Sequence, residues 1–600
     1  MLVNGFMTFA FICFVEIVLK RAEEHSIAPY TFDLSVLMTC ILVSAYIFSE
    51  YDAMGTYFYK TSSSSSNGNS DNDEDESGKR KKKIGFVEYF VSLASSLILP
   101  SFMCRIQCIL NGDCVQRMYS RSFPFVVLLN LFLTIYSSKS REMGINTNAD
   151  AAKKSMLLSS LHRFVTLILG FLVILYGGNL LMSAQFYLIL GLIGMLRLIC
   201  YAEHANRMGF SLTLFEECLV ATSIAYLISD VSYLEATKSQ RNRSIGDEGS
   251  FSNTEISYLV ELAIVSLISL LVTSNFVLYS IKIKFGQINN NLRTIVTITM
   301  ATSVLVLVYL KAQQFIGCNP LLYLYKFFII QSGRRLFIAS VWIFLLIVGI
   351  PTSRYLAQAF TMPILHSRKL FHLLLTLICY PVLMQDARAV GNMVPFVSLA
   401  LGGAFCVLLV LESLRIYLSS NDDTSRKQEV THLQQMKTAL NNFYVGFLKP
   451  DHCDLRILVK DHLTLILGCS IPIWFVLSLN PQLNQCVRDG CRYYAVKYVG
   501  FWAVGIADSV SAIVGSTYGR TFWWLNASKR TLEGSCIALL LTIVFILLFH
   551  YLFFQAFDLY EMAIATLCML GLTVVEAYTV EDDNLILPIY GCVLYAILLI

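Results

Sequence analysis

Runs of apolar residues long enough to cross a lipid bilayer recur along this chain. Clear examples are Ile256–Ile281, Val394–Leu411, Cys536–Phe554 and Leu585–Ile600. A helix needs about 20 apolar residues to cross the hydrocarbon core. Inside lipid the backbone must satisfy its own hydrogen bonds, which favours helices over open strands. The runs therefore predict an all-α, polytopic membrane bundle with roughly 15–17 transmembrane helices by this length rule.

The overall composition agrees with a membrane protein. Of the 600 residues, 56% are hydrophobic and only 14% are charged, whereas a soluble domain carries about a quarter charged residues. The formal net charge of +4 argues for no particular partner, and we expect no nucleic-acid partner. The first apolar run, Leu2–Leu19, contains Glu16 and has no basic region before it. We therefore interpret it as a retained span and not as a cleaved signal.

One strongly polar stretch, residues 61–83, interrupts the apolar runs and should be a disordered loop. It ends in the basic cluster Lys79–Lys83, and cytosolic loops of membrane proteins are enriched in Lys and Arg. Placing this cluster in the cytosol puts the N-terminus in the cytosol and the C-terminus in the lumen. The later cytosolic loops are then Lys139–Lys154, Lys282–Arg293, Ser353–Lys369, Leu414–Lys460, Gly519–Arg530 and Val580–Asn584.

The chain divides near His366. Residues 1–365 form an N-terminal multi-span region whose polar residues are scattered. No matched pair of broken helices of the kind found in transporters is visible. In residues 366–600 the polar residues become dense and fall into five short segments. They are Arg368–His372, Glu412 with Arg415, Gly505–Gly515, Ser528–Ser535, and Glu576 with Asp582–Pro588.

The topology places all five segments at or near the cytosolic membrane surface. Together they supply cations, carboxylates and small residues. Phosphoryl transfer from a nucleotide needs this mixture, because cations and a carboxylate-bound metal neutralise phosphate oxygens while another group receives the acceptor's proton. Small residues let the backbone approach a phosphate closely.

Asp508 carries the most weight, because it lies within an apolar span. An ionisable residue there is costly and points to function; the alternative is a structural hydrogen bond to a neighbouring helix. Glu576 also lies within an apolar run, which favours a shared polar site.

The basic residues are individually ambiguous. Lys529 and Arg530 could form an ordinary basic loop, but one span from Asp508 they favour a phosphate site. Arg368 and Lys369 suit any cytosolic helix end. His372 lies one helical turn beyond Arg368, so the two can share a face.

Two further groups of charged residues are weaker candidates. Glu412 and Arg415, at spacing i, i+3, are a candidate local ion pair. Asp461 and His462 stand at the beginning of another apolar run.

The usual nucleotide motifs are missing. The chain has no Gly-x-x-x-x-Gly-Lys-Ser/Thr loop, so it is not a P-loop kinase, and protein-kinase motifs are absent. The glycine-punctuated stretch Gly515–Arg520 is a weak signal by itself.

The order and spacing of the segments resemble the CTP-dependent polyprenol kinase family, over roughly His366 to Pro588. Ala507 stands where the family has Gly, Ser511-Ala512 reverses the usual Ala-Ser, and Arg530 replaces a Lys or Ser. The matching motifs are Arg368-Lys369 with His372, Asp508 to Gly515, Lys529 to Gly534, and Asp583-Asn584-Leu585 with Pro588.

This resemblance implies CTP as the phosphoryl donor, a divalent cation (Mg²⁺ or Ca²⁺) and a membrane-embedded prenol as the acceptor. The long N-terminal run of spans and residues 515–529 look most like the members that phosphorylate dolichol. The implied location is the endoplasmic reticulum, where dolichyl phosphate carries sugars for N-glycosylation.

The resemblance also implies roles for individual residues, with a CTP-binding loop at about 508–535. The catalytic candidates are Asp508, His372, Glu533 and Asp583, and the metal candidates are Asp508 and Glu533. The CTP-binding candidates are Arg368, Lys369, Ser509, Gly515, Ser516, Thr517, Gly519, Arg520, Lys529, Arg530, Thr531, Gly534 and Asn584.

Three alternatives remain at this point. The acceptor could be another lipid alcohol, such as phytol or diacylglycerol. The chain could be a transporter with Asp508 as its ion site, although this would not explain why the charged motifs gather at one face. A cytidylyltransferase that makes a CDP-lipid would share the donor.

Overall fold

A computed structural model of the chain describes ten stretches beyond residue 250, together with positions 227, 231, 234 and 235. These stretches are residues 253–285, 290–330, 333–360, 363–386, 393–419, 460–477, 492–523, 530–554, 559–579 and 582–599. The loop 61–83 and the earlier predicted spans lie outside the described residues.

The described stretches are helical almost throughout, and within them no strand is present apart from a single bridge between Phe522 and Thr531. Seven helices of the described stretches are long and apolar enough to cross a membrane. They contain the spans Ile298–Ile316, Gly333–Ser353, Leu365–Met384, Met393–Arg415, Ala495–Tyr518, Leu532–Phe549 and Leu559–Tyr578. The prediction of an all-α, polytopic membrane protein is confirmed.

Each of the four apolar runs chosen as examples falls on a helix. These helices are α9 (Asn253–Phe285), α14 (Met393–Ser419), α19 (Leu532–Phe554) and α21 (Asp583–Leu599). Helices α10 (Asn290–Ile316) and α12 (Gly333–Ala359) keep many large apolar side chains exposed, for example Leu307 and Phe344. Such surfaces suit contact with lipid tails. Helix α11 (Pro320–Tyr325) and the π-helical turn η3 (Lys326–Ile330) connect α10 to α12.

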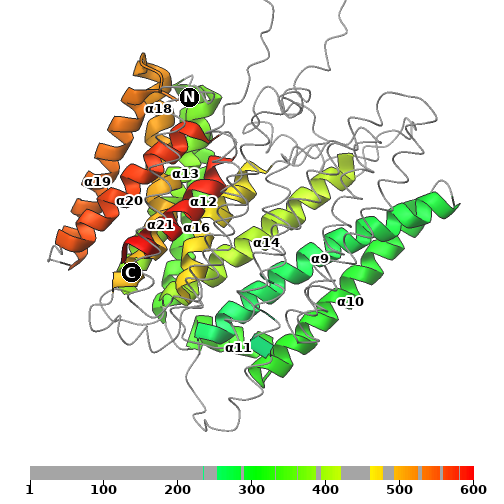
Figure 1. Cartoon of the computed structure of the whole chain (residues 1–600). Coiled ribbons are helices and arrows are strands. Elements are labelled where there is room, and N and C mark those ends of the chain that lie inside the picture. The colour runs from blue at the N-terminus through cyan, green and yellow to red at the C-terminus, as the bar shows by residue number, and fades with distance from the viewer. Residues whose placement is uncertain are drawn as a thin grey trace, which may run out of the picture.

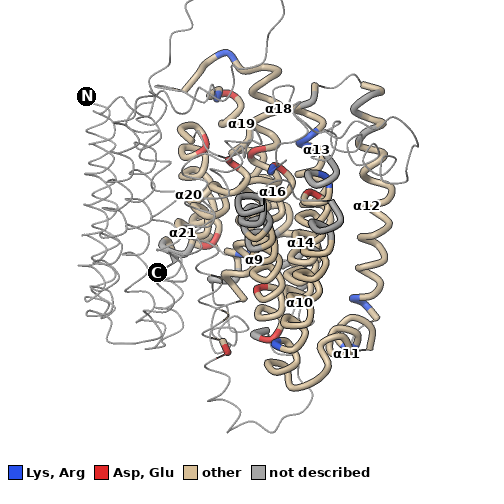
Figure 2. Tube along the Cα trace, turned by 90° about the vertical axis from the view of Figure 1, so that its right-hand side faces the viewer, with Lys and Arg blue, Asp and Glu red and all other residues tan. Residues whose placement is uncertain are grey.

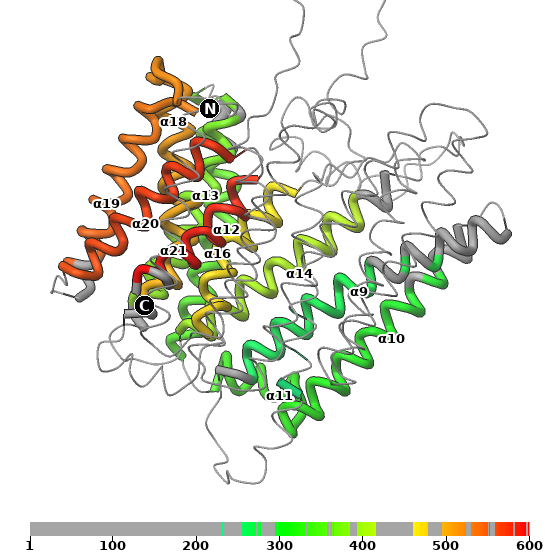
Figure 3. The backbone as a smooth tube through the Cα atoms, viewed as in Figure 1, coloured from blue at the N-terminus to red at the C-terminus, as the bar shows by residue number. Residues whose placement is uncertain are grey.

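The C-terminal helices form one compact group (Figure 1). It consists of α13 (Ile364–Asp386), α16 (Asp461–Leu477), α18 (Asp508–Tyr518), α19, α20 (Leu559–Tyr578) and α21. Helix α18 packs against α19 and α13, and α21 packs against α16 and α20. Helices α9 and α10 lie side by side as a hairpin at the edge of this group, against α14 (Figure 3).

The centre of the group is aromatic. Trp502, Tyr380, Tyr498 and Tyr595 are almost completely buried, and the Trp502 indole donates a hydrogen bond of 3.1 Å to the Tyr380 hydroxyl. A buried Tyr or Trp needs such a partner for its polar atom. This core fixes the turns η5 (Arg492–Tyr498) and η6 (Phe501–Ala507), which lead directly into α18.

Charged residues gather at one end of the group, around the beginnings of α13 and α19 and the end of α18 (Figure 2). The segments that the sequence analysis expected to meet at one membrane face lie here. The apolar core is therefore bordered, at this end of the group, by a polar cluster.

Candidate active site

Asp508 is the first residue of α18 and its side chain is fully buried. It follows directly on η6, which is a π-helical turn, and such turns are frequent at functional sites. Gly505 lies in this turn against α13, where a Cβ atom would collide with the Thr376 hydroxyl. The missing side chain therefore lets η6 approach α13 and brings Asp508 close to that helix.

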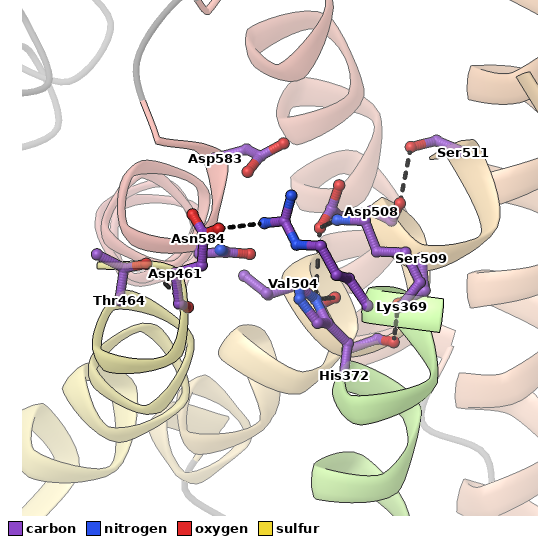
Figure 4. Close-up of polar contacts among 12 residues, drawn as sticks. Lys369, His372, Asp461, Thr464, Val504, Asp508, Ser509, Ser511, Asp583 and Asn584 are labelled. Atoms are coloured by element: carbon purple, nitrogen blue, oxygen red, sulfur yellow. Dashed lines mark hydrogen bonds and ion pairs between the residues drawn. The ribbon is translucent and has the colours of Figure 1, made fainter. Parts of the chain in front are cut away.

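Two residues of α13 contact the Asp508 carboxylate (Figure 4). Lys369 forms an ion pair with its Oδ2 atom, and His372 Nδ1 lies 3.5 Å from the same oxygen. His372 Nδ1 is also 3.2 Å from the carbonyl oxygen of Val504. When Nδ1 donates to that carbonyl, Nε2 is the ring nitrogen that can accept a proton.

Arg530 brings a second cation to the cluster from the segment just before α19. Its Nη2 atom pairs with Asp583 and lies 3.9 Å from Asp508 Oδ1, and its Nη1 atom lies 3.3 Å from Glu576 Oε1. Burial by itself would lower the pKa of the Arg530 guanidinium, but the carboxylates of Glu576, Asp583 and Asp508 outweigh it and raise this pKa. Arg530 therefore carries its charge at every physiological pH.

Arg368 belongs to a neighbouring ion pair. Its Nη2 atom lies 2.7 Å from Asp461 Oδ2, at the beginning of α16. Hence Lys369 shares the Asp508 contact with His372, and Arg368 turns toward another helix. Lys369, Arg530 and Arg368 each contact a carboxylate from a different helix. These contacts hold three side chains of the type that binds phosphate within one polar cluster.

Helices α18 and α19 approach each other through glycines. A Cβ atom on Gly515 would lie 2.8 Å from Thr531 Oγ1, and one on Gly534 would lie 2.9 Å from the Cα of Gly515. The Thr531 side chain is buried here, and its hydroxyl has no hydrogen-bond partner among the described residues. The predicted CTP-binding residues Gly515, Thr531 and Gly534 are thus brought together.

Other predicted residues lie around the end of α18. Ser516 Oγ is 2.8 Å from His366 Nε2, and Thr517 donates to the carbonyl of Ile513 at 2.8 Å. Gly519 ends the helix, and the exposed Arg520 follows it. Lys529 lies outside the described residues.

Three predicted residues make local hydrogen bonds that each involve a backbone group. Ser509 donates to the carbonyl of Gly505 at 2.9 Å. The backbone N–H of Asn584 donates to Asp582 Oδ1 at 3.1 Å, at the beginning of α21. Both Glu533 carboxylate oxygens accept from the Thr521 amide, at 3.0 and 3.1 Å. The structure therefore uses Glu533 to hold the loop before α19, and it does not bring this carboxylate to Asp508.

Among the described residues, no group of three or more His, Cys, Asp or Glu side chains is arranged to hold a metal ion. Asp508 is nevertheless suited to a cation, because its Oδ1 atom is buried without a hydrogen-bond partner. A hard divalent cation prefers such carboxylate oxygens. Asp508 therefore fits a metal-ligand role, whereas the contacts of Glu533 do not.

The structure adds residues that sequence reasoning had ranked low or passed over. Glu576 accepts a 2.6 Å hydrogen bond from Ser511 and also faces Arg530. Its place inside an apolar run was the available signal. Asp461 was a weak candidate and proves to be the partner of Arg368. Glu412 and Arg415 form the expected local ion pair, with both side chains buried.

Comparison with known proteins gives a consistent result. No family model matches the chain, and no solved structure matches it. Three curated relatives carry the name dolichol kinase. The one from Arabidopsis thaliana is 26% identical over 278 residues (45% of this chain and 42% of the relative). Those from Homo sapiens and Saccharomyces cerevisiae are each 28% identical, over 288 residues (46% and 47%) and 277 residues (46% and 44%).

The chain spans somewhat less than half the length of these curated relatives. The relatives nevertheless come from a plant, an animal and a yeast and bear the same name. The sequence analysis placed the motifs that resemble this family in the part of the chain where the charged cluster lies. The resemblance to dolichol kinases that the motifs predicted is therefore confirmed over 45–46% of this chain.

Proposed function

We propose that this chain transfers the γ-phosphoryl group of CTP to dolichol, giving dolichyl phosphate and CDP. The observation that supports this most strongly is the cluster around Asp508. In it, cations from α13 and from the segment before α19 meet carboxylates from α18, α20 and α21 at one end of a membrane bundle. An acceptor hydroxyl at the membrane surface and a nucleotide from the aqueous phase could meet at such a place.

Lys529, Arg530 and Arg368 are the proposed ligands of the triphosphate. A guanidinium offers fixed, forked donors that match phosphate oxygens, and both arginines are already held by carboxylates. The glycines at the α18–α19 contact let these helices pack closely and so bring the segment that carries Arg530 close to α18.

Asp508 is the proposed ligand of a divalent cation through its Oδ1 atom, which has no hydrogen-bond partner among the described residues. Such a cation, when bound, neutralises charge on the phosphate oxygens. Lys369 pairs with this carboxylate, and an adjacent positive charge favours the charged form.

The acceptor hydroxyl must lose its proton as its oxygen bonds to the γ-phosphorus and the bond to the CDP oxygen breaks. Asp583 and His372 are the two candidates to receive this proton. The Asp583 side chain is 22% exposed, whereas that of His372 is 5% exposed. Asp583 is thus the more accessible to a hydroxyl arriving from the membrane surface.

We further propose that the protein lies in the membrane of the endoplasmic reticulum, with this site facing the cytosol, where CTP is available. Its product would then supply the lipid carrier for protein N-glycosylation. The basic loops on the same side of the predicted topology support this orientation.

The direct test uses purified protein, dolichol and CTP labelled at the γ-phosphorus. We expect label in the lipid and release of CDP. Parallel reactions with phytol and diacylglycerol, and with labelled ATP, measure the preference for acceptor and donor. Release of pyrophosphate would identify a cytidylyltransferase instead, and absence of label in every lipid would reject the proposal.

A further inference from the structure

Glu576 is a carboxylate whose position the phosphoryl-transfer chemistry does not by itself explain. It lies near the end of α20, within a membrane span, and only 3% of the residue is exposed. A charge in such a place is costly unless it is paired and hydrogen-bonded. Its contacts therefore indicate what it is for.

Glu576 contacts Ser511 and Arg530 through the same oxygen atom. Oε1 accepts a 2.6 Å hydrogen bond from Ser511 Oγ, and it lies 3.3 Å from Arg530 Nη1. Ser511 is on α18, one turn beyond Asp508, and its hydroxyl also lies 3.2 Å from the Asp508 carbonyl oxygen. Glu576 thus connects α20 both to the helix that carries Asp508 and to the cation before α19.

These contacts fix the orientation of the Arg530 guanidinium. One end of its fork, Nη1, faces Glu576, and the other end, Nη2, faces Asp583 and Asp508. A planar group held at both ends by carboxylates on different helices cannot rotate about its own axis without losing one of them. In a variant without Glu576, Nη1 of Arg530 would lose this carboxylate contact.

We propose that Glu576 is a positioning residue, which, itself fixed by Ser511, sets the guanidinium of Arg530 between Asp508 and Asp583. What the positioned guanidinium does for CTP rests on the proposed function, whereas the position itself does not.

The test is a double-variant cycle of wild type, Glu576→Gln, Arg530→Ala and the combination of both. Gln keeps an oxygen that can accept from Ser511 but removes the charge. Glu561→Gln, at the opposite end of α20, is the matched control. Thermal unfolding in detergent gives the first readout, because it needs no substrate.

We expect Glu576→Gln to lower the melting temperature when Arg530 is present and to raise it, or leave it unchanged, when Arg530 is Ala. The sign should reverse because Glu576 without Arg530 only repels Asp508 and Asp583. Equal lowering in both backgrounds would overturn the inference. Should Glu576→Gln not be recovered in folded form, Glu576→Asp replaces it in the same cycle, because the shorter side chain keeps the charge but not the reach to Arg530; its lowering of the melting temperature should again become smaller when Arg530 is Ala.

Activity gives the second readout. Glu576→Gln should reduce kcat/KM for CTP by about tenfold, the size of one charge-assisted hydrogen bond, and leave the KM for dolichol within about twofold. With Arg530 already Ala, the further loss should not exceed about twofold, because coupled residues are not additive. A full tenfold loss in that background would also overturn the inference. Wild-type protein that does not phosphorylate dolichol from CTP would reject the proposed function, and the unfolding cycle would still decide the role of Glu576.

Discussion

Replacing Asp508 with Asn tests the centre of the site, since Asn keeps the shape of the side chain and removes its charge. Asp508 is fully buried, and the side chain of its partner Lys369 is 9% exposed. Leaving a buried charge without its partner costs about 3–5 kcal/mol. Losing one preorganised electrostatic group in a catalytic site typically lowers the rate by about a hundredfold or more. Asp508→Asn should therefore lower both the melting temperature and the activity.

A second substitution separates the two effects. Combining Asp508→Asn with Lys369→Met removes both charges, and a neutral pair of similar volume is often as stable as the buried ion pair it replaces. We expect the double variant to regain most of the melting temperature and to remain inactive.

The measurements are the thermal unfolding of detergent-solubilised protein and the transfer of label from CTP to dolichol, well below the melting temperature. Lys311→Met is the control, because it breaks an ion pair in which both side chains are substantially exposed, at 49% and 32%; such pairs contribute about 0.2–1 kcal/mol. Asp508→Asn activity within about twofold of wild type would refute the metal-ligand role. So would activity that returns together with stability in the double variant.

Three further results are expected. Lys529→Ala should mainly raise the KM for CTP, because it removes a ground-state phosphate contact; unchanged CTP dependence with impaired dolichol use would move this residue to the acceptor side. Gly505→Ala should destabilise the protein by about 1–3 kcal/mol through overpacking, and a simultaneous Thr376→Ala, which removes the colliding hydroxyl, should restore stability in thermal unfolding if the collision is the cause. Two segments match the N-glycosylation sequon: Asn242-Arg243-Ser244, in a loop that the predicted topology places in the lumen, and Asn526-Ala527-Ser528, in the predicted cytosolic loop before α19. Glycosidase treatment should reveal a glycan on Asn242 and never on Asn526, since only lumenal sequons are modified. A glycan on Asn526 would place the loop before α19 in the lumen and contradict the cytosolic site.

The membrane spans could be predicted from the sequence because their signal is local. An apolar run of sufficient length has few alternatives to a helix in lipid, and the four runs singled out all lie on helices. The meeting of the polar segments was predictable for a related reason. Alternating spans place every second loop on the same face, and the contacts from Lys369 through Asp508 to Arg530 and Asp583 confirm that these segments meet.

The pairing of individual charges could not be predicted in the same way. Arg368 and Lys369 are neighbours in sequence, but successive residues of a helix point about 100° apart, so one reaches Asp461 and the other Asp508. The rotation of α13 about its own axis, relative to α16 and α18, decides which of the two residues faces which carboxylate. Glu533 shows the same limit: the family resemblance implied a metal-binding role for it, while in the structure its carboxylate accepts from the Thr521 backbone amide.

The pairing also bears on how a nucleotide could bind. Helices in lipid gain little from hydrophobic association. Ion pairs that join α13 to α16 and α18, and the segment before α19 to α20 and α21, therefore help to hold this end of the bundle together. A triphosphate would compete with Asp461, Glu576 and Asp583 for the same cations. Binding of the triphosphate is therefore favourable only if a cation binds together with it or if a cation stays bound to the carboxylates. The Oδ1 atom of Asp508, which accepts no hydrogen bond from the described residues, lies among these carboxylates. This is a physical reason to expect that the nucleotide and a divalent cation bind together.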